Sequence, residues 1–545
     1  MGAKSSEHRT STDKISSNPR TSDCETSMTT AEEGPVDPGP GRPKLYRTLS
    51  VAIILGFSLK NVLTICLEMA AISSILCSAL CILPEDVNRV RMFSNLILVL
   101  AIGNLAQSTF GVRQSVMHST SYILLCPILF YLNSPSNQCP GVGDLFAMGP
   151  EQRRILWTNK VQHLHGSFII IALVQVVFSL PTLYSWLSRV ISPITLVTTA
   201  IFIPVAFLDT IVDKCSKNAF LSIGTIVLFS VVAYNVSVYK IKVHDTKIQV
   251  WNFLAFLIAV GVAWTVCVLL TWFDVVSAVS SARTDLHSSM SHYIEYINPY
   301  PCLFEWGLPR FSLSAIAIIV PATLVTIPYA VENYKTINRK QARRRETLHL
   351  TKGLYVDALC TILNVLLGSV TGFQTSSESL RDITETKIWN RRIVQVSSLF
   401  LLCLSMWTPF CFHFTQLPEP LLGAILTILC AQQVVSCVCI VSKRVDLLSK
   451  RTLYIITMSI LVSEVLDRSL PSLSMDSTHT SRLLLVILLS TMLHHITSTT
   501  ANTSIDSHPH QDFTPIDSLP NHANESINEC VSSLEQVTCC CLSCL

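Results

Sequence analysis

Long apolar runs constrain this chain more than any other feature. Runs of about 18 or more apolar residues recur between residues 48 and 496, and each can cross a hydrocarbon core about 30 Å thick. Only 14% of the residues are charged, against about 25% in soluble domains. Because lipid offers no partners to an open backbone, these runs are expected to be helices. The sequence predicts an all-α polytopic membrane protein.

About fourteen spans are predicted, and basic residues set their orientation. Basic clusters occur near residues 44–47, 240–247, 339–345, 391–392 and 443–451. With a cytoplasmic N-terminus and that number of spans, every cluster lies on the cytoplasmic side. We expect a multi-pass protein of the plasma membrane with both termini in the cytoplasm. The spans should begin near Leu49, Arg91, Gln114, Gly166, Ile191, Asn218, Val250, Phe311, Gly353, Ser369, Ile393, Leu421, Thr452 and Arg482.

The remaining composition excludes several classes of function. A net charge of +3 is too small to indicate nucleic-acid binding, and the basic residues lie in loops. The sequence has no Gly-Lys-Ser/Thr phosphate loop and no Gly-x-Ser-x-Gly elbow. Its paired histidines have no cysteine or carboxylate at a metal-ligand spacing. We expect no enzyme activity, no metal site and no resident cofactor.

Cysteines outside the apolar runs carry two hypotheses. Cys139 and Cys302 lie in two long loops that this topology places outside. That compartment is oxidising, so a Cys139–Cys302 disulfide is one interpretation and two separate thiols are the other. At the termini, Gly2 fits an N-myristoylation pattern, with a chance match as the alternative. Palmitoylation or unmodified thiols are the alternatives for Cys539, Cys540, Cys541 and Cys544.

Several stretches resemble one transporter family. The most specific carries PYPC at residues 299–302 and WGLP at residues 306–309, similar to the eighth-helix region of animal vitamin C transporters. Another aligns without a gap on the family signature, with Thr386 and Lys387 at its conserved Thr-Arg/Lys. On these stretches the chain resembles the nucleobase–ascorbate transporter family, of the nucleobase:cation symporter-2 type, and within it the sodium-coupled vitamin C branch. The stretches are residues 107–140, 165–181 with 191–199, 282–334 and 366–395.

The resemblance implies two inverted seven-span repeats that form a core domain and a gate domain. It also implies a homodimer through the gate helices. The implied parts are a disordered cytoplasmic N-tail at 1–47, core spans one to four at 48–187, gate spans five to seven at 188–276, an extracellular loop at 277–310, core spans eight to eleven at 311–415, gate spans twelve to fourteen at 416–500, and a cytoplasmic C-tail at 501–545.

The resemblance places the solute between a broken third and a broken tenth segment, where helix ends offer backbone dipoles. Ser121 and Tyr122 match a small residue followed by an aromatic residue in the third segment. The ring would stack on a planar solute, or alternatively pack between helices. Ser377 and Glu378 match the tenth segment. A carboxylate at membrane depth is costly and usually functional, but Glu378 could instead form a salt bridge to Arg381 or Lys387.

Other candidate positions depart from the family pattern. Tyr329 replaces a substrate-contacting Glu, and Asn333 replaces an Asp-like residue four positions later. Glu332 can replace that carboxylate only if the helix is rotated or unwound, since adjacent helical residues point about 100° apart. Asn61 lies at the first-helix substrate position, after Lys60. Asn333 and Glu332 are the candidate cation ligands, and the loss of the carboxylates should weaken Na⁺ binding there, because hard cations prefer charged oxygen ligands.

The sequence therefore predicts a secondary carrier of a small planar solute, of ascorbate or nucleobase type, working by alternating access. Na⁺ is the candidate coupling ion, and the bilayer is the remaining expected partner. Two alternatives stay open. The altered site favours a transport-silent regulatory or scaffold protein. Lys60, together with the missing carboxylates, favours an uncoupled facilitator or anion channel.

Overall fold

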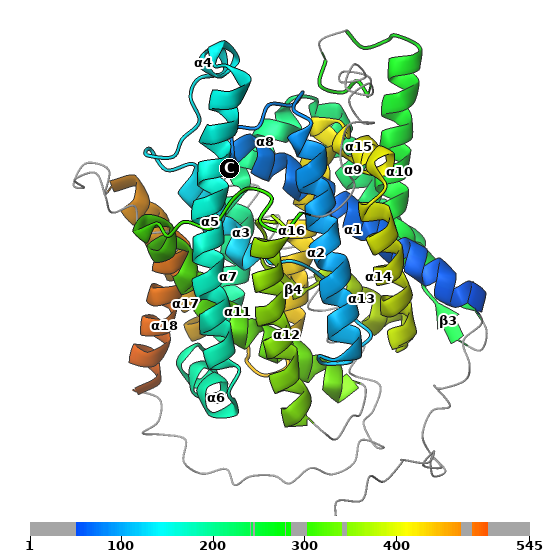
Figure 1. The fold of residues 1–545 in the computed structure, drawn as a ribbon. Helices are drawn as coiled ribbons and strands as arrows, with labels where there is room; N and C mark the ends of the chain where they lie inside the picture. Colours follow the sequence, from blue (N-terminus) through cyan, green and yellow to red (C-terminus); the bar gives the residue numbers. More distant parts are fainter. Residues whose placement is uncertain are drawn as a thin grey trace, which may run out of the picture. The chain divides into compact units, whose positions relative to one another are not determined.

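The computed structural model describes residues 51–239, 241–243, 246–277, 280–284, 302–340, 346–469 and 482–499. The lipidation candidates Gly2 and the C-terminal cysteines lie outside them. Helices dominate the described part (Figure 1). The helices are α1 Val51–Ala79, α2 Asn88–Thr109, α3 Tyr122–Leu132, α4 Val142–Ala147, α5 Pro150–Phe178, α6 Pro181–Val190, α7 Pro193–Ala206, α8 Leu208–Ser216, α9 Ala219–Ser230, η1 Val231–Asn235, η2 Val236–Val238, α10 Val250–Trp272, α11 Leu313–Lys340, α12 Glu346–Leu366, α13 Ser377–Thr386, α14 Arg391–Ser405, α15 Thr408–Thr415, α16 Glu419–Val441, α17 Lys450–Ser469 and α18 Arg482–Thr499; the strands are β1 His118–Thr120, β2 Ile241–Val243, β3 Thr246–Ile248 and β4 Phe373–Thr375.

Seven helices among the described residues are long and apolar enough to cross a membrane. They are α1, α2, α5, the α7–α8 stretch Pro193–Ser216, α10, α11 and α16. The pair α14–α15 is bent by 91° and gives an eighth if it is one span. An apolar helix satisfies its backbone internally, which a span in lipid must do. The helical multi-pass fold is therefore confirmed, and the finer count of about fourteen spans stays a prediction.

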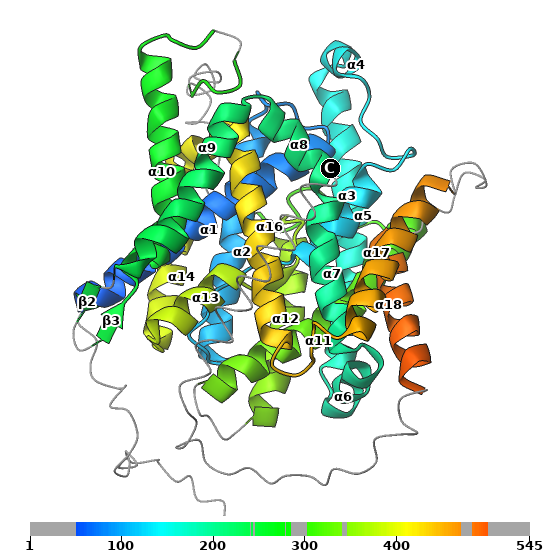
Figure 2. The same cartoon turned by 180° about the vertical axis from the view of Figure 1, so that it is seen from behind.

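The helices pack in two groups. In the first group, α2 packs against α1, α12 and α14, while α11 packs against α3 and α5 (Figure 1). In the second group, α16 packs against α7, α8 and α9, and α18 packs against α7 and α17 (Figure 2). Contacts between the groups run from α1 to α10 and α16, and from α3 to α7. Helix α13 lies against α10 and α16, so this short helix belongs to the boundary between the groups.

The loop that precedes α11 is fixed to the first group of helices by three polar contacts. The indole of Trp306 donates a hydrogen bond of 2.8 Å to the carbonyl oxygen of Gly368, and Asn95 donates one of 2.8 Å to the Glu305 carboxylate. Arg91 forms an ion pair with the same Glu305 carboxylate. Gly368 has a φ of +72°, a conformation that suits glycine. The WGLP motif thus fixes the chain that enters α11 onto α2 and the end of α12.

The predicted Cys139–Cys302 disulfide is wrong. Cys139 is bonded to Cys81, which stands two residues beyond the end of α1, across 58 residues of sequence. Cys302 is exposed, and its Sγ lies 3.7 Å from the Arg91 guanidinium. The bridge ties the end of α1 to the segment before α4.

Replacing Cys81 with serine should lower the stability of the protein by about 2–4 kcal/mol, because the bridge restricts a long loop in the unfolded chain. Thermal unfolding of detergent-purified protein measures the loss. Cys302→Ser is the matched control and should melt like the unmodified protein. A non-reducing peptide map that links Cys139 to Cys302 would contradict this pairing.

Candidate functional site

Two interrupted segments meet in the interior of the helix assembly. Strand β1 leads into α3 after Ser121, and strand β4 leads into α13 after Ser376. The strands pair antiparallel, with Ser119 opposite Gln374, and all their residues are buried. The Ser121 hydroxyl donates a hydrogen bond of 2.7 Å to Gln374. The N-terminal ends of two helices, each with unpaired N–H groups and a positive dipole end, therefore lie beside one strand pair.

The sequence explains both interruptions. A Cβ atom on Gly372 would lie 2.9 Å from Cβ of Ser121 and 2.6 Å from the Leu124 side chain, so only glycine lets the strands approach this closely. Ser376 ends the second interruption, because its hydroxyl accepts a hydrogen bond of 3.3 Å from the Ser379 N–H and caps α13. The chain is therefore extended through β4, turns at Ser376 and is helical from Ser377.

A carboxylate from α1 holds the start of α3. Glu68 is 2% exposed, and its Oε1 accepts hydrogen bonds from the Ser119 hydroxyl at 2.9 Å and the Tyr122 hydroxyl at 3.0 Å. The Tyr122 ring meets the Phe207 ring edge-on, with centroids 6.5 Å apart. Phe207 joins α7 to α8, so the predicted site aromatic touches the second helix group.

A cluster of four charges surrounds the start of α13. Lys60 of α1 is 3% exposed, and its Nζ lies 3.1 Å from Oε1 of Glu378 and forms a second ion pair with Asp382. Arg381 contacts the same Glu378 oxygen at 2.8 Å. The salt bridge predicted as the alternative role of Glu378 is therefore present. The Nζ atom of Lys60 also lies 4.9 Å from the ring centroid of Phe253 on α10.

Gln433 of α16 links two predicted site residues. Its amide nitrogen donates a hydrogen bond of 2.8 Å to the Tyr329 hydroxyl, and its amide oxygen accepts one from the Ser377 hydroxyl. Tyr329 is on α11, and Ser377 begins α13. Since α11 belongs to the first group and α16 to the second, this bridge crosses between the two groups at the helix start.

The other predicted residues lie apart from these bridges. Glu332 forms an ion pair of 2.7 Å with Arg444, just beyond α16, while its second oxygen has no hydrogen-bond partner among the described residues. Asn333 is buried, and its amide oxygen likewise has no hydrogen-bond partner among the described residues. Asn61 is half-buried on α1 beside Lys60. Solute binding by Asn61 and cation binding by Glu332 and Asn333 stay predictions.

A second buried network supports β1 from the opposite side. Asp357 of α12 accepts a hydrogen bond of 2.6 Å from Gln107 and one of 2.8 Å from the Tyr334 hydroxyl. That hydroxyl lies 3.0 Å from Nε2 of His118, whose ring stacks on Phe373 with centroids 4.9 Å apart. The network therefore fixes the first residue of β1 and the first residue of β4 to α2, α11 and α12.

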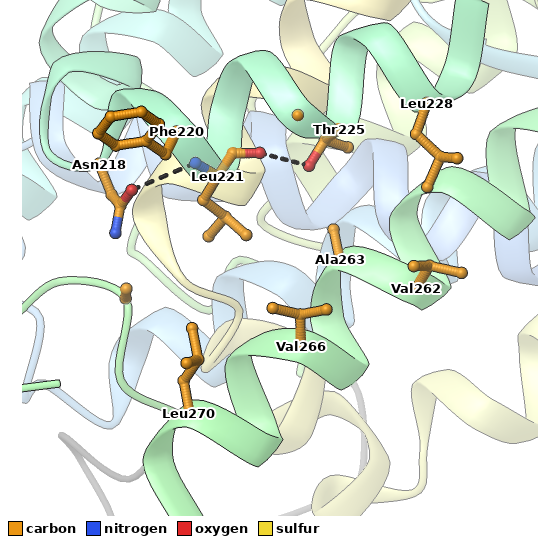
Figure 3. Close-up of a pocket in the computed structure, with 11 residues that line it drawn as sticks. Asn218, Phe220, Leu221, Thr225, Leu228, Val262, Ala263, Val266 and Leu270 are labelled. Atoms are coloured by element: carbon orange, nitrogen blue, oxygen red, sulfur yellow. Dashed lines mark hydrogen bonds between the residues drawn. The ribbon is translucent and has the colours of Figure 1, made fainter. Parts of the chain in front are cut away.

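A hollow of about 450 Å³ lies elsewhere, between α9 and α10 (Figure 3). Its polar side chains are already engaged within α9: Asn218 accepts a hydrogen bond of 3.2 Å from the Leu221 N–H, and Thr225 donates one of 2.7 Å to the Leu221 carbonyl. Leu228, Val266 and other apolar side chains form the rest of the wall. An apolar hollow suits a lipid chain better than a polar solute, so we place the functional site at the strand pair.

Four residues of this site escaped the sequence prediction: Glu68, Asp382, Gln433 and the β4 residue Gln374. Each is a polar side chain within or beside an apolar segment, which is the signal that could have found them. Asp382 also stands four residues after Glu378, on the same face of a helix.

Residues 52–466 match the sequence profile of the xanthine/uracil permease family, described as the permease family. The chain belongs to this family. Solute carrier family 23 member 2 of Rattus norvegicus is 27% identical over 434 residues, which cover 76% of this chain and 66% of that protein. Member 1 of the same organism is 26% identical over 74% of this chain and 70% of its own length. The permease thus spans a little under two thirds of the first of these relatives.

A plant transporter and a solved structure are also similar to this chain, at lower sequence identity. Nucleobase-ascorbate transporter 11 of Arabidopsis thaliana is 22% identical over 63% of this chain and 49% of that protein. Among solved structures, murine solute carrier 26 family member A9, an anion transporter in the inward-facing state, superposes with a TM-score of 0.54 at 10% identity, covering 84% of this chain and 70% of the other. That likeness concerns the fold alone. The predicted family and the prediction that the chain is no enzyme are both confirmed.

Proposed function

We propose that this permease is a secondary carrier for a small planar organic solute of ascorbate or nucleobase type. The observation that carries the proposal is the meeting of two helix N-termini at the β1–β4 pair, on the boundary between two helix groups. Paired helix starts offer backbone N–H groups and positive dipole ends to acceptor atoms of a solute. Tyr122 adds a ring that can stack on a planar molecule.

The architecture supports alternating access of a core against a gate. The antiparallel pairing of β1 with β4 is what two inverted repeats with a broken segment each would produce. We assign α1, α2, α3, α5 and α11–α15 to the core and α7–α10 and α16–α18 to the gate, with about fourteen spans in all. Cytoplasmic termini, a plasma-membrane location and a homodimer through the gate helices belong to the same proposal.

Uptake of labelled ascorbate and labelled uracil into cells that express the permease tests the proposal. One of the two solutes should enter faster than into empty-vector cells. Tyr122→Ala should lower kcat/KM for that solute about tenfold, equivalent to ~1.4 kcal/mol, because the stacking ring is lost. Trp272→Ala, which removes an 82% exposed ring from α10, is the control and should leave uptake unchanged.

The two alternative functions predict different results in this experiment. If neither solute enters above background while the protein is at the cell surface, the carrier proposal for both solute types fails, and a transport-silent role takes its place. Uptake that Tyr122→Ala leaves unaltered would place the solute away from the strand pair. An uncoupled facilitator would also give uptake of a solute here, so a comparison of media with and without Na⁺ is needed to separate coupled from uncoupled transport.

A further inference from the structure

The lysine within α1 occupies an unusual position for a charged side chain. Lys60 lies in an apolar helix and is 3% exposed, where an unpaired charge would be strongly destabilising. Its Nζ contacts oxygens of two carboxylates, Glu378 and Asp382. Both carboxylates are on α13, one helical turn apart, at the start of the broken segment. The ammonium group therefore sits between two anionic side chains of the proposed solute site.

The charges in contact balance without any additional ion. Lys60 and Arg381 are cationic, and Glu378 and Asp382 are anionic. Removing the Lys60 charge would thus leave an excess of buried negative charge next to oxygen atoms, which is the environment that small hard cations prefer.

Oxygen atoms around Lys60 also have unused capacity. Oε2 of Glu378 is buried and accepts no hydrogen bond from the described residues, and Oδ1 of Asp382 has the Arg381 guanidinium 3.8 Å away but no hydrogen bond from those residues. Thr64 is one helical turn from Lys60 on the same face of α1 and is 4% exposed. Its hydroxyl has no hydrogen-bond partner among the described residues. A structural salt bridge alone would not require these unpaired acceptors. These oxygen atoms belong to α1 and α13, the two helices that the Lys60 ion pairs join.

We propose that Lys60 is a tethered cation: its ammonium group takes the place that a free monovalent cation would occupy between Glu378 and Asp382, so transport proceeds without a coupling cation. This inference rests on the proposed carrier function. Lys60 also contacts the Phe253 ring on α10, so the fixed charge faces the second helix group as well as α13. A carrier of this kind runs down the gradient of its solute, whatever the Na⁺ gradient is.

The test compares wild type with Lys60→Met in Na⁺ medium and in choline medium of equal ionic strength. Wild-type uptake and wild-type melting temperature should be the same in both media. Lys60→Met should acquire a small-cation site: its uptake should be at least about fivefold higher in Na⁺ than in choline, the lower end of ordinary coupling between two ligands. Its melting temperature should rise by about 2–4 °C in saturating Na⁺.

Three further variants make the result specific. Lys60→Arg keeps the charge and should stay indifferent to Na⁺. Lys60→Met with Asp382→Asn removes one charge of each sign and should also lose the Na⁺ response. Lys217→Met, which removes an exposed lysine paired with Glu419, should behave as wild type in both media.

The melting measurement separates this inference from the carrier proposal, because it needs no known solute. Wild-type uptake or melting that depends on Na⁺ would overturn the tethered-cation inference, even if Lys60→Met fails to fold. A folded Lys60→Met protein that ignores Na⁺ would overturn it too. Absence of uptake for both solutes, with the expected Na⁺-dependent melting of Lys60→Met, would instead overturn the carrier proposal and leave the cation site standing.

Discussion

Replacing Asp357 with alanine is expected to destabilise the permease by about 3 kcal/mol. The carboxylate is 5% exposed and accepts hydrogen bonds from Gln107 and Tyr334. Each hydrogen bond to a buried charged group contributes about 1.5–3 kcal/mol, and its loss leaves a buried donor poorly paired. Because Tyr334 also contacts His118, the loss should spread to β1. Thermal unfolding in detergent, with surface expression as a second readout, measures the effect.

Asp357→Asn provides the graded comparison. Its amide oxygen still accepts a hydrogen bond from Gln107, while the charge is lost, so its stability should fall between those of alanine and wild type. Thr427→Ala serves as the control, because it removes a hydroxyl that bonds only the preceding turn of α16, and it should change stability little. An alanine variant of Asp357 that melts like wild type would show that the network contributes nothing to stability.

Replacing Glu68 with alanine is expected to lower uptake of the transported solute about 10²-fold, the loss typical of a binding group displaced by about 1 Å. Glu68 is the acceptor for the Tyr122 hydroxyl and the Ser119 hydroxyl. Without it, the ring of Tyr122 can turn and the start of α3 is no longer fixed to α1. Uptake kinetics at several solute concentrations measure kcat/KM, and surface biotinylation corrects for protein amount.

Glu68→Gln distinguishes positioning from charge. The glutamine keeps an acceptor oxygen at the same reach, so it should recover most of the uptake that alanine loses. If glutamine is as damaging as alanine, the negative charge of Glu68 matters for transport, and the positioning account is wrong. Ser78→Ala, which removes a hydroxyl bonded within the last turns of α1, should leave uptake unchanged in the same assay.

The length of the apolar runs predicted most of the helices, because the hydropathy that identifies a span is a property of one continuous stretch of sequence. The helix at Val250 begins where the sequence placed it, and the described parts of α1 and α18 start at Val51 and Arg482, close to the predicted Leu49 and Arg482. The largest departure is α5, which begins at Pro150 rather than near Gly166. Its first turns contain Arg153 and Arg154, so a hydropathy criterion cannot see a helix that continues past the apolar stretch.

The candidate site was harder to predict, because its bonds join distant segments. Ser121, Tyr122, Ser377 and Glu378 were identified from the two broken segments, and the structure gives each of them a partner within the site. The partners themselves were not predictable from local pattern. Lys60 and Glu378, for example, are separated by 318 residues, and only the three-dimensional fold brings them together.

The cysteine prediction failed for a related reason. The oxidising compartment and the loop positions limited the candidate partners of Cys139 to cysteines in outside loops. A cysteine at the end of a span was not among those candidates. Cys81 adopts a φ of 69°, which ends α1 sharply and turns the chain toward Cys139. Backbone conformation of this kind is uncommon for a residue other than glycine, so residue type alone gave no indication of it.

The ladder between β1 and β4 has a consequence for how the molecule discriminates between the two sides of the bilayer. Main-chain hydrogen bonds join the two helix starts into one piece, so neither can move without the other. A bound molecule would then meet the same amides whichever aqueous phase it came from. The intrinsic affinity of the site for its solute would then be nearly equal whether the site is open to one side of the bilayer or to the other. Any directionality of net flow would come from the gradient and not from the binding surface.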